Sequence, residues 1–214
     1  MIGTLLPDEV VVVSAPPDPP PSRLHPEEQA LAAEMGETRR REFALGRACA
    51  HAALDRLGAS GPVLRERRMP VWPAGVVGSL THCPGYCAAA VARSGALRSL
   101  GIDAEQDAPL SLRAMHRICT PDEIDALAAL GGDAPERWAK LVFSAKEAFY
   151  KAWFPLTGVF LGFRDVALRI DPDCAGFEVR LLRDVPDVPD GPRAARGRYA
   201  LAPPHVLTAL TVPY

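Results

Sequence analysis

The sequence predicts an α+β fold of two similar subdomains, each a long helix packed on a small, mainly antiparallel sheet. Two stretches with apolar residues at helical spacing, one in each half of the chain, predict the long helices. Short β-branched runs between proline and glycine turns predict the strands. A length of 214 residues fits one domain, or two small ones that share a core. We therefore expect pseudo-twofold halves, residues 1–106 and 107–214, that meet near Glu105 to Leu112.

The first half should begin with a strand and continue into its long helix. Val10 to Ser14 is a β-branched run and predicts a strand, which Pro16 to Pro21 cannot continue. A helical pattern starts at about Pro26 and is strongest from Glu37 to Leu57, with Gly58 as a C-terminal stop.

The rest of the first half predicts one turn and two strands. Gly75 to Gly78 has turn-like composition. Tyr86 to Ala92 and Ser99 to Glu105 have strand composition, and a short turn at Ser94-Gly95 joins them.

The second half predicts two helices followed by strands. Thr120-Pro121-Asp122-Glu123 is a good helix start, because threonine caps, proline takes the first position and glutamate returns a hydrogen bond. A longer helix should run from about Pro135 to Trp153 and end before Pro155. Asp184 to Arg196 is polar and proline-rich, so we expect a loop there. Four further segments predict strands: Val166 to Ile170, Phe177 to Leu182, Gly197 to Leu201 and Val206 to Val212.

Composition excludes several classes of protein. A net charge of −2 gives no sign of a nucleic-acid binder, so any phosphate site must be local. No apolar run reaches the ~20 residues that span a bilayer, and Met1 to Val13 lacks the pattern of a signal peptide. The five cysteines are an odd number and favour reduced thiols over disulfides. We expect a cytoplasmic monomer that binds neither nucleic acid nor membrane.

A pair of carboxylates is the first candidate site. Asp103 and Glu105 lie at i and i+2 on a predicted strand, so both face the same way, with Ile102 and Ala104 on the other face. Two like charges side by side are unfavourable unless a cation sits between them. Carboxylate oxygens without nearby thiols favour Mg²⁺, with Glu147 as a third ligand. The alternative is an exposed strand end with two solvated acids.

All three lysines of the chain lie in one stretch, Lys140 to Lys151. At about 100° per residue, Lys140, Ser144, Glu147 and Lys151 share one stripe of this helix. Val142, Ala145, Phe149 and Ala152 occupy the opposite face. The stripe is either a phosphate-binding face or a solvated face with a Glu147–Lys151 salt bridge.

Two further groups could bind phosphate. Gly78 to His82, which includes Ser79 and Thr81, offers backbone N–H groups, hydroxyls and an imidazole in one turn. Arg39, Arg40, Arg41 and Arg47 gather on one helix, and Arg67 lies in the loop before Pro70. A phosphomonoester with two charges would attract such a cluster. The alternatives are a structural histidine and solvated arginines.

Together these residues resemble the 4′-phosphopantetheinyl transferases, in particular the larger pseudo-dimeric type that activates surfactin and enterobactin synthetases, in its actinobacterial-like branch. The family signature is a Gly-Ile-Asp-x-Glu strand followed by a Trp-x-x-Lys-Glu-Ala-x-x-Lys-like helix. Here the strand is Gly101 to Glu105, and the helix runs from Trp138 to Lys151. The similarity covers roughly residues 37–162. Cys87 and His51 stand where this branch often has arginine.

The resemblance implies the role of each site residue. Asp103, Glu105 and Glu147 would bind Mg²⁺, or Mn²⁺ in its place, on the pyrophosphate of coenzyme A. Lys151, together with Lys146, would contact the pyrophosphate itself. The adenosine 3′-phosphate and nearby groups would be held by a basic and hydroxyl set: Arg39 or Arg40, Arg47, Arg67, Ser79, Thr81 and His82.

The implied reaction moves the 4′-phosphopantetheine arm to a serine of an apo acyl or peptidyl carrier protein of nonribosomal peptide, polyketide or siderophore biosynthesis. Adenosine 3′,5′-bisphosphate is released. Glu147 would take the serine proton and Lys151 would stabilise the departing phosphate. Two alternatives remain. A Mg²⁺-dependent phosphohydrolase would consume coenzyme A without a carrier protein, and a non-catalytic coenzyme A-binding module should have lost a metal carboxylate.

Overall fold

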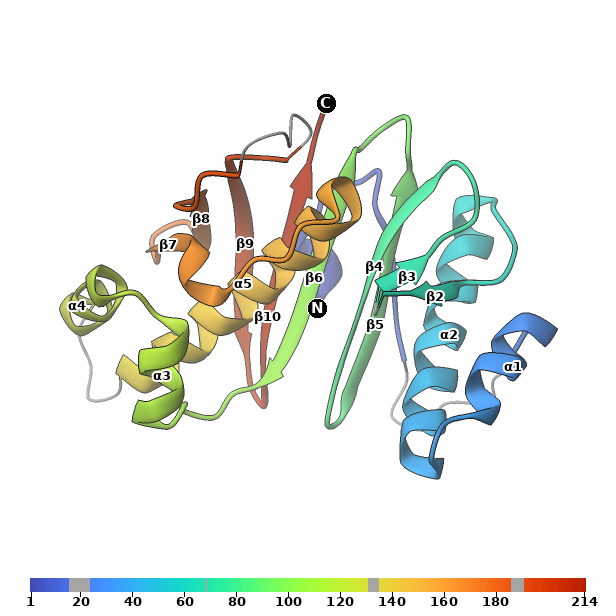
Figure 1. The fold of residues 1–214 in the computed structure, drawn as a ribbon, viewed down its shortest axis with the longest axis horizontal. Coiled ribbons are helices and arrows are strands. Elements are labelled where there is room, and N and C mark those ends of the chain that lie inside the picture. The colour runs from blue at the N-terminus through green and yellow to red at the C-terminus, as the bar shows by residue number, and fades with distance from the viewer. Residues whose placement is uncertain (16–23, 68, 131–134, 186–190) are drawn as a thin grey trace.

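The computed structural model describes residues 1–15, 24–67, 69–130, 135–185 and 191–214. The predicted loop at Pro16 to Pro21 lies outside these ranges, and so does part of the predicted loop from Asp184 to Arg196. The described chain has an α+β fold, as predicted: two antiparallel sheets each carry one long helix, and a short two-stranded ribbon lies beside the sheet and the long helix of the N-terminal part (Figure 1).

The N-terminal part consists of helix α2 (Glu37–Leu57) on a three-stranded sheet in the order β1-β5-β4. Its strands are β1 (Val11–Ser14), β4 (Val76–Cys83) and β5 (Tyr86–Arg93). Helix α1 (Pro26–Ala33) packs beside α2, and β2 (Leu64–Glu66) pairs with β3 (Met69–Val71). The predicted bounds of α2 are confirmed, because Gly58 adopts the left-handed conformation (φ 68°) that ends the helix.

The predicted turn from Gly75 to Gly78 is only partly present. Gly75 has φ 77° and makes the turn, but β4 already begins at Val76. The strand starts there because Val76 pairs with Arg93 and Val77 with Ala92 in the antiparallel register of β4 and β5. Ser79, Thr81 and His82 therefore belong to a strand.

The C-terminal part consists of helix α5 (Pro135–Thr157) on a five-stranded sheet in the order β6-β10-β9-β8-β7. The strands are β6 (Ser99–Gln106), β7 (Val166–Asp171), β8 (Gly176–Leu181), β9 (Ala194–Ala202) and β10 (His205–Val212). Helices α3 (Leu112–Ile118) and α4 (Pro121–Ala129) lie at one end, and the predicted capping box of Thr120 and Glu123 is confirmed.

The predicted end of α5 before Pro155 is wrong, because the helix continues through this proline to Thr157. A proline removes one helical N–H donor, but here the loss falls in the last turn. The Thr157 hydroxyl donates to the carbonyl of Trp153, and the Gly158 N–H donates to the carbonyl of Phe154. These two bonds satisfy carbonyl groups that the helix end leaves open.

Strand β6 joins the two parts. The predicted boundary after residue 106 assigns β6 to the first half, but its backbone pairs with β10. Hydrogen bonding therefore argues for a boundary between β5 and β6, and the division at residue 106 stays a prediction. On its other side β6 meets β4 through side chains, because the Ile102 N–H donates to the Ser79 hydroxyl (3.2 Å) and the Ala104 N–H to the Thr81 hydroxyl (2.9 Å).

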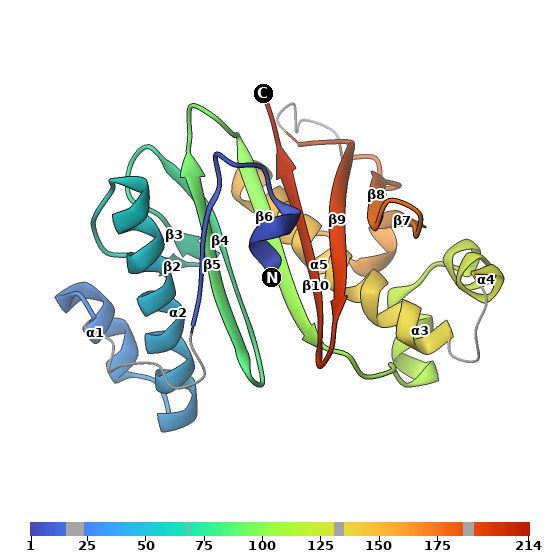
Figure 2. The ribbon, with the colours of Figure 1, turned by 180° about the vertical axis from the view of Figure 1, so that it is seen from behind.

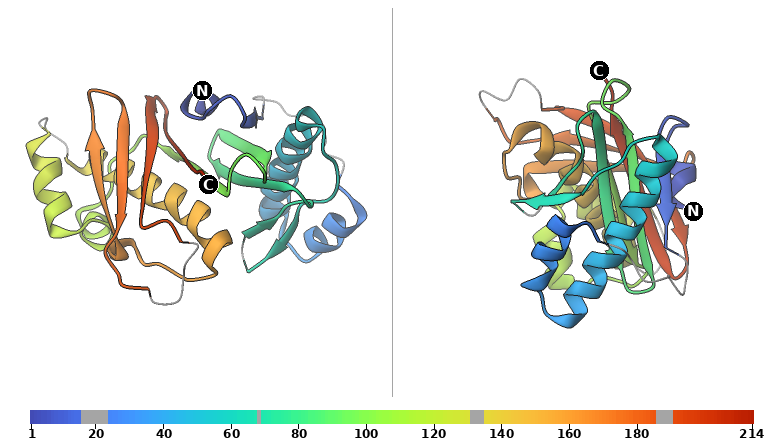
Figure 3. Two further views of the ribbon diagram at one scale, coloured as in Figure 1. Left: turned by 90° about the horizontal axis from the view of Figure 1, so that it is seen from above. Right: turned by 90° about the vertical axis from the view of Figure 1, so that its right-hand side faces the viewer.

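The two faces of β6 differ in character, as the period-two pattern predicts. Ile102 and Ala104 are buried in a core that a 3₁₀ turn at Ile2–Leu5 covers. Figure 2 shows this N-terminal turn in front of β6 and β10, and the view from above in Figure 3 shows α5 on the opposite side of the sheet. Asp103 and Glu105 face α5.

Helix α5 approaches β6 closely at Gly101. A Cβ built on Gly101 would overlap the carbonyl oxygen of Ala148, so the helix backbone lies almost directly on the strand. The side of α5 that faces away from the site residues packs into the main core, where Val142, Ala145 and Phe149 are fully buried. The position of α5 on the sheet is therefore set by a residue without a side chain and by a large apolar core.

Gly101→Ala should lower the free energy of unfolding by at least about 1–3 kcal/mol, because overpacking forces backbone shifts. Gly95→Ala is the matched control, since a Cβ there meets nothing within 4 Å; it should change stability by no more than about 0.5 kcal/mol. Urea unfolding of both variants measures the difference. Equal stabilities for the two variants would contradict the close approach of α5 to β6.

Candidate active site

The polar stripe of α5 lies on the carboxylates of β6. Lys140 Nζ is 3.3 Å from Glu105 Oε2, and Lys151 Nζ is 2.7 Å from Asp103 Oδ1. Ser144 donates to Asp103 Oδ2 at 2.8 Å. The solvated-face interpretation of the stripe is therefore wrong: Ser144 is fully buried, and Lys151 pairs with Asp103 across 48 residues of chain.

Asp103 is the centre of this contact. Its side chain is almost fully buried, and it accepts from Ser144, from Lys151 and, at 3.4 Å, from the Thr81 hydroxyl. Lys151 also donates to the carbonyl of Ile102 (3.1 Å), next to Asp103. A buried carboxylate is stable only with such partners. Three donors, Ser144, Lys151 and Thr81, therefore hold Asp103 in place.

Glu105 and Glu147 are two further carboxylates that interact electrostatically with Asp103. Burial raises the pKa of Glu105, and the charge of Asp103 raises it further. Burial also raises the pKa of Glu147, with smaller contributions of the same sign from Asp103 and Glu105, while Lys151 opposes them. Carboxylates that raise one another's pKa gain from a shared cation.

This donor set fits a hard divalent cation, although the described ranges contain no group of three His, Cys, Asp or Glu side chains already arranged around a metal position. The ammonium groups of Lys140 and Lys151 lie on Glu105 and Asp103 instead. Oxygen ligands without thiols favour Mg²⁺, which keeps waters and binds through few carboxylates plus phosphate.

A cleft of about 620 Å³ lies next to Asp103, because Lys151, which bonds Asp103, also lines this cleft. This size is typical of sites for small ligands. Basic side chains from both parts of the chain line it: Arg39, Arg47, Arg65, Arg67, His82 and Lys151. A smaller cavity of about 180 Å³ contains Glu147 and shares Tyr150 and Phe160 with the cleft.

One carboxylate occupies part of the basic cleft. Glu42 accepts from Arg39 at 2.9 Å and lies 3.4 Å from His82 Nε2, while Arg39 and His82 are 3.2 Å apart. The hydrogen bond from Arg39 is the main reason that the pKa of Glu42 is lowered, with the charge of His82 adding to it. Glu42 thus marks a position where an anion contacts Arg39 and His82 together.

Arg47 is buried deeper in the cleft wall. Its guanidinium lies 4.2 Å from the centre of the Phe43 ring and donates to the carbonyl of Leu64 (3.1 Å), and its Nε is 3.8 Å from Glu28 Oε1. Burial lowers the pKa of Arg47 to about 10, and the nearby Arg65 and Arg39 act in the same direction. Arg47 remains charged at neutral pH, and an anion would relieve its repulsion with Arg65.

Ser79 and Thr81 also line the cleft, but their hydroxyls accept from the backbone of β6 as described above. The sequence prediction placed them with His82 in one turn. On a strand, period two sends Ser79 and Thr81 to one face and His82 to the other. Their side chains therefore position β6, and His82 remains the member of this segment with an exposed polar group.

Two predicted ligands lie outside the cleft lining. Arg40 donates to the carbonyls of Ala32 and Met35, so it ties α1 to α2, and Arg39 is the arginine that reaches the cleft. Lys146 is 2% exposed and its ammonium has three acceptors: the carbonyls of Ile118 and Phe163 and the carboxylate of Glu123. The structure does not bring Lys146 to the cleft.

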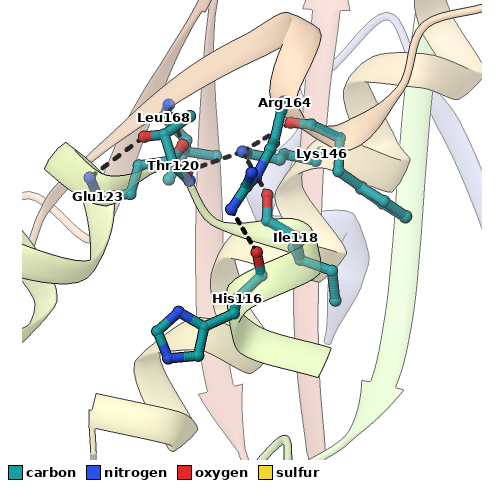
Figure 4. A network of polar contacts seen from close by, with 8 residues as sticks. His116, Ile118, Thr120, Glu123, Lys146, Arg164 and Leu168 are labelled. Atoms are coloured by element: carbon teal, nitrogen blue, oxygen red, sulfur yellow. Dashed lines mark hydrogen bonds and ion pairs between the residues drawn. The ribbon is translucent and has the colours of Figure 1, made fainter. Parts of the chain in front are cut away.

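Figure 4 shows what Lys146 does instead: its side chain points from α5 into the segment between α3 and α4. Glu123 Oε1 also accepts from the Leu168 N–H at 2.7 Å, so this buried pair links α5, α4 and β7. Arg164 adds a bond to the carbonyl of His116. The helical stripe argument did not include Lys146, whose partners come from distant segments.

Comparison with known proteins gives two family matches and several relatives. Residues 27–92 match the 4′-phosphopantetheinyl transferase N-terminal domain, and residues 99–191 match the 4′-phosphopantetheinyl transferase superfamily. The chain is 46% identical to the 4′-phosphopantetheinyl transferase Svp of Streptomyces mobaraensis, over 99% of this chain and 89% of that protein. It is 40% identical to PptT of Mycobacterium tuberculosis, over 91% and 88%. The chain belongs to the 4′-phosphopantetheinyl transferase superfamily.

The transferase also resembles enterobactin synthase component D of Escherichia coli K12, at 38% identity over 55% of this chain and 56% of that protein. The matches to Svp and PptT confirm the actinobacterial-like branch predicted from the motifs. Neither a phosphohydrolase nor a non-catalytic binding module is supported by these relatives. In the described ranges, no helix is both long and apolar enough to cross a bilayer.

Sequence reasoning missed part of the cleft. Arg65 lies on β2 and lines the cleft beside Arg67, which follows the strand in a turn with φ 46°. Strand alternation does not extend to Arg67, so the spacing of the two arginines could not have predicted that both reach the cleft. The apolar lining, which includes Phe43, Tyr150 and Phe160, carries no signal in the sequence either. Aromatic residues at these positions are equally consistent with a core.

Lys146→Met in this transferase should lower the free energy of unfolding by about 3–5 kcal/mol, because it leaves the Glu123 carboxylate buried without its cation. Arg169→Met is the control: it removes an ion pair to Glu178 on the surface, where Arg169 is 73% exposed, and should cost at most about 1 kcal/mol. Denaturant unfolding measures both. A loss for Lys146→Met no larger than that of the control would contradict the structural role.

Proposed function

We propose that the transfer of 4′-phosphopantetheine from coenzyme A to a carrier-protein serine takes place where the stripe of α5 meets β6. The observation that carries this proposal is the position of Lys151. Its ammonium bonds Asp103, and its side chain also lines the basic cleft. A pyrophosphate at this point would have the carboxylates on one side and the arginines on the other.

The cleft would hold the adenosine end of coenzyme A. Arg39 and His82, which contact the Glu42 carboxylate, would take the 3′-phosphate in its place. Arg47, Arg65 and Arg67 supply further positive charge along the wall. Ser79 and Thr81 would contribute to the shape of the wall, since their hydroxyls bond β6.

Asp103, Glu105 and Glu147 would hold Mg²⁺, or Mn²⁺ in its place. When bound, the metal neutralises charge on the phosphate oxygens during an in-line displacement. Lys140 and Lys151 must then give up part of their contact with Glu105 and Asp103. Lys151 is partly exposed and has a flexible stem, so it can turn to a phosphate oxygen.

The bond changes balance without a covalent enzyme intermediate. The serine oxygen of the carrier protein forms a bond to the phosphorus nearest the pantetheine arm, the bridging P–O bond breaks, and adenosine 3′,5′-bisphosphate leaves. Glu147 takes the serine proton, directly or through a water, and its raised pKa makes it a better base than an ordinary glutamate. Lys151 stabilises the charge that builds on the leaving phosphate.

The proposed partners are apo acyl or peptidyl carrier proteins, which accept the group that the phosphopantetheinyl transferase relatives are named for. A siderophore pathway agrees with the name of enterobactin synthase component D. We further propose that the chain acts as a monomer in the cytoplasm. The five cysteines, all free thiols in the structure, support a reducing compartment.

Arg39→Ala should weaken binding of coenzyme A by about 1.5–3 kcal/mol, as for a lost charged hydrogen bond, and leave binding of 3′-dephospho-coenzyme A nearly unchanged. The neighbouring Arg40→Ala is the matched control, because Arg40 bonds backbone carbonyls outside the cleft; it should not change the ratio of the two affinities. Isothermal titration calorimetry measures both ligands. An equal loss with both ligands in Arg39→Ala would show that Arg39 does not bind the 3′-phosphate.

Glu147→Gln should keep the fold and lower kcat for phosphopantetheinylation by about 10²-fold or more, followed as the mass gain of an apo carrier protein. Because a base must be deprotonated and the pKa of Glu147 is raised, the wild-type rate should rise with pH through a pKa above the usual range of glutamate. Near-normal turnover of Glu147→Gln would contradict its role. Wild-type consumption of coenzyme A without a carrier protein would support the phosphohydrolase instead.

A further inference from the structure

Two elements, α5 and β10, bring buried hydroxyl groups next to Asp103. Thr208 of β10 lies directly across from Asp103 of β6 in the antiparallel register. Ser144 of α5 contacts both residues: its Oγ is 2.8 Å from Asp103 Oδ2 and 2.8 Å from Thr208 Oγ1. Ser144 and Thr208 are fully buried, and Asp103 is 4% exposed.

The direction of these hydrogen bonds follows from the number of protons. Ser144 has one hydroxyl proton, and it donates this proton to Asp103. Ser144 must therefore accept in its bond with Thr208, so Thr208 is the donor there. The result is a directed chain from Thr208 through Ser144 to Oδ2 of Asp103, with every proton pointing toward the carboxylate.

The fold alone gives no reason for these hydroxyls. Thr208 lies between Leu207 and Ala209 on a strand whose neighbours are buried and apolar. A valine would fill nearly the same space without a polar atom to satisfy. The cost of desolvating a buried hydroxyl is offset only when the hydroxyl forms a hydrogen bond. Among the described residues, the hydrogen-bond partner of the Thr208 hydroxyl is Ser144.

The two oxygens of Asp103 are held by different groups. Oδ1 accepts from Lys151 and Thr81, and Oδ2 accepts from Ser144. In the reaction proposed above, Lys151 turns toward phosphate and loosens its hold on Oδ1. Ser144 has no proposed contact with phosphate, so its hydrogen bond to Oδ2 can persist throughout the reaction.

We propose that Ser144 and Thr208 are positioning residues: their directed hydroxyl chain fixes the Asp103 carboxylate for the divalent cation once Lys151 has left it. This inference rests on the proposed role of Asp103 as a metal ligand. Groups that hydrogen-bond a metal ligand orient it, and their removal commonly costs about 10–100-fold in metal affinity. Thr208 contacts neither substrate nor metal and acts only through Ser144.

The test measures Mn²⁺ binding to the coenzyme-free chain by electron paramagnetic resonance. Ser144→Ala should raise the Mn²⁺ dissociation constant about tenfold. Thr208→Val, which keeps the shape, should raise it by a smaller factor. Thr208→Ser, which keeps the hydroxyl, should retain the wild-type affinity. Thr211→Val on the same strand removes a hydroxyl at a position paired with Leu100 and should have no effect.

The double variant Ser144→Ala/Thr208→Val distinguishes an effect of the hydrogen-bonded hydroxyls from a general loss of packing. Because Thr208 acts only through Ser144, the double variant should bind Mn²⁺ as Ser144→Ala does, with no further loss. The half-saturating Mg²⁺ concentration for carrier-protein modification should shift in parallel, at a temperature well below the melting point of every variant. Thermal unfolding monitors the fold, and Thr208→Val keeps the test valid if Ser144→Ala does not fold.

Unchanged Mn²⁺ affinities with lowered melting temperatures would overturn the proposal, because the hydroxyls would then serve the fold alone. Losses that add in the double variant would overturn it as well, since Thr208 would act independently of Ser144. A wild-type chain that binds no Mn²⁺ but still modifies carrier protein would overturn the metal assignment itself. If instead the wild type and all variants bind Mn²⁺ equally, the positioning role of Ser144 and Thr208 fails while the metal assignment stands.

Discussion

Helix α5 can reach the carboxylates of β6 because Gly101 has no side chain. The backbone of the helix lies against this glycine at Ala148, and the apolar face of α5 is fixed in the core. From this one contact the rest of the site follows. Ser144 and Lys151 come within hydrogen-bond distance of Asp103, and the end of α5 reaches the cleft that α2 and β4 line on the other side.

The packing of α5 on β6 also buries carboxylates, and nearby lysines offset part of their charge. Burial raises the pKa of Glu105 and Glu147, while the ammonium groups of Lys140 and Lys151 lie on Glu105 and Asp103. In the cleft the signs are reversed, because the Glu42 carboxylate contacts both Arg39 and His82. Each charged partner thus occupies a place that a cation or a phosphate of the proposed substrate would take. Such a site is held in shape before its ligands bind, which lowers the cost of ordering it on binding.

Local periodicity predicted much of this from the sequence. Period two placed Asp103 and Glu105 on one face of β6, and helical spacing placed Lys140, Ser144 and Lys151 on one stripe of α5. Local periodicity could not predict contacts between residues far apart in the sequence. The pairing of β6 with β10, which brings Thr208 to Asp103, joins segments about a hundred residues apart that share no motif. The buried partners of Lys146 come from three distant positions, Ile118, Glu123 and Phe163, so its charge was assigned to phosphate by resemblance alone. Ser79 and Thr81 were misplaced because small polar residues after a glycine fit a turn as well as a strand.

The most direct test of the account is to locate the cation. Crystals of the transferase grown with coenzyme A and Mn²⁺ should show one anomalous scattering peak per chain, in contact with Asp103, Glu105, Glu147 and the pyrophosphate of the coenzyme. The 3′-phosphate should lie against Arg39 and His82, with Lys151 turned from Asp103 to a phosphate oxygen. A well-ordered coenzyme whose pyrophosphate lies away from the three carboxylates, or a Mn²⁺ peak that touches none of them, would contradict it.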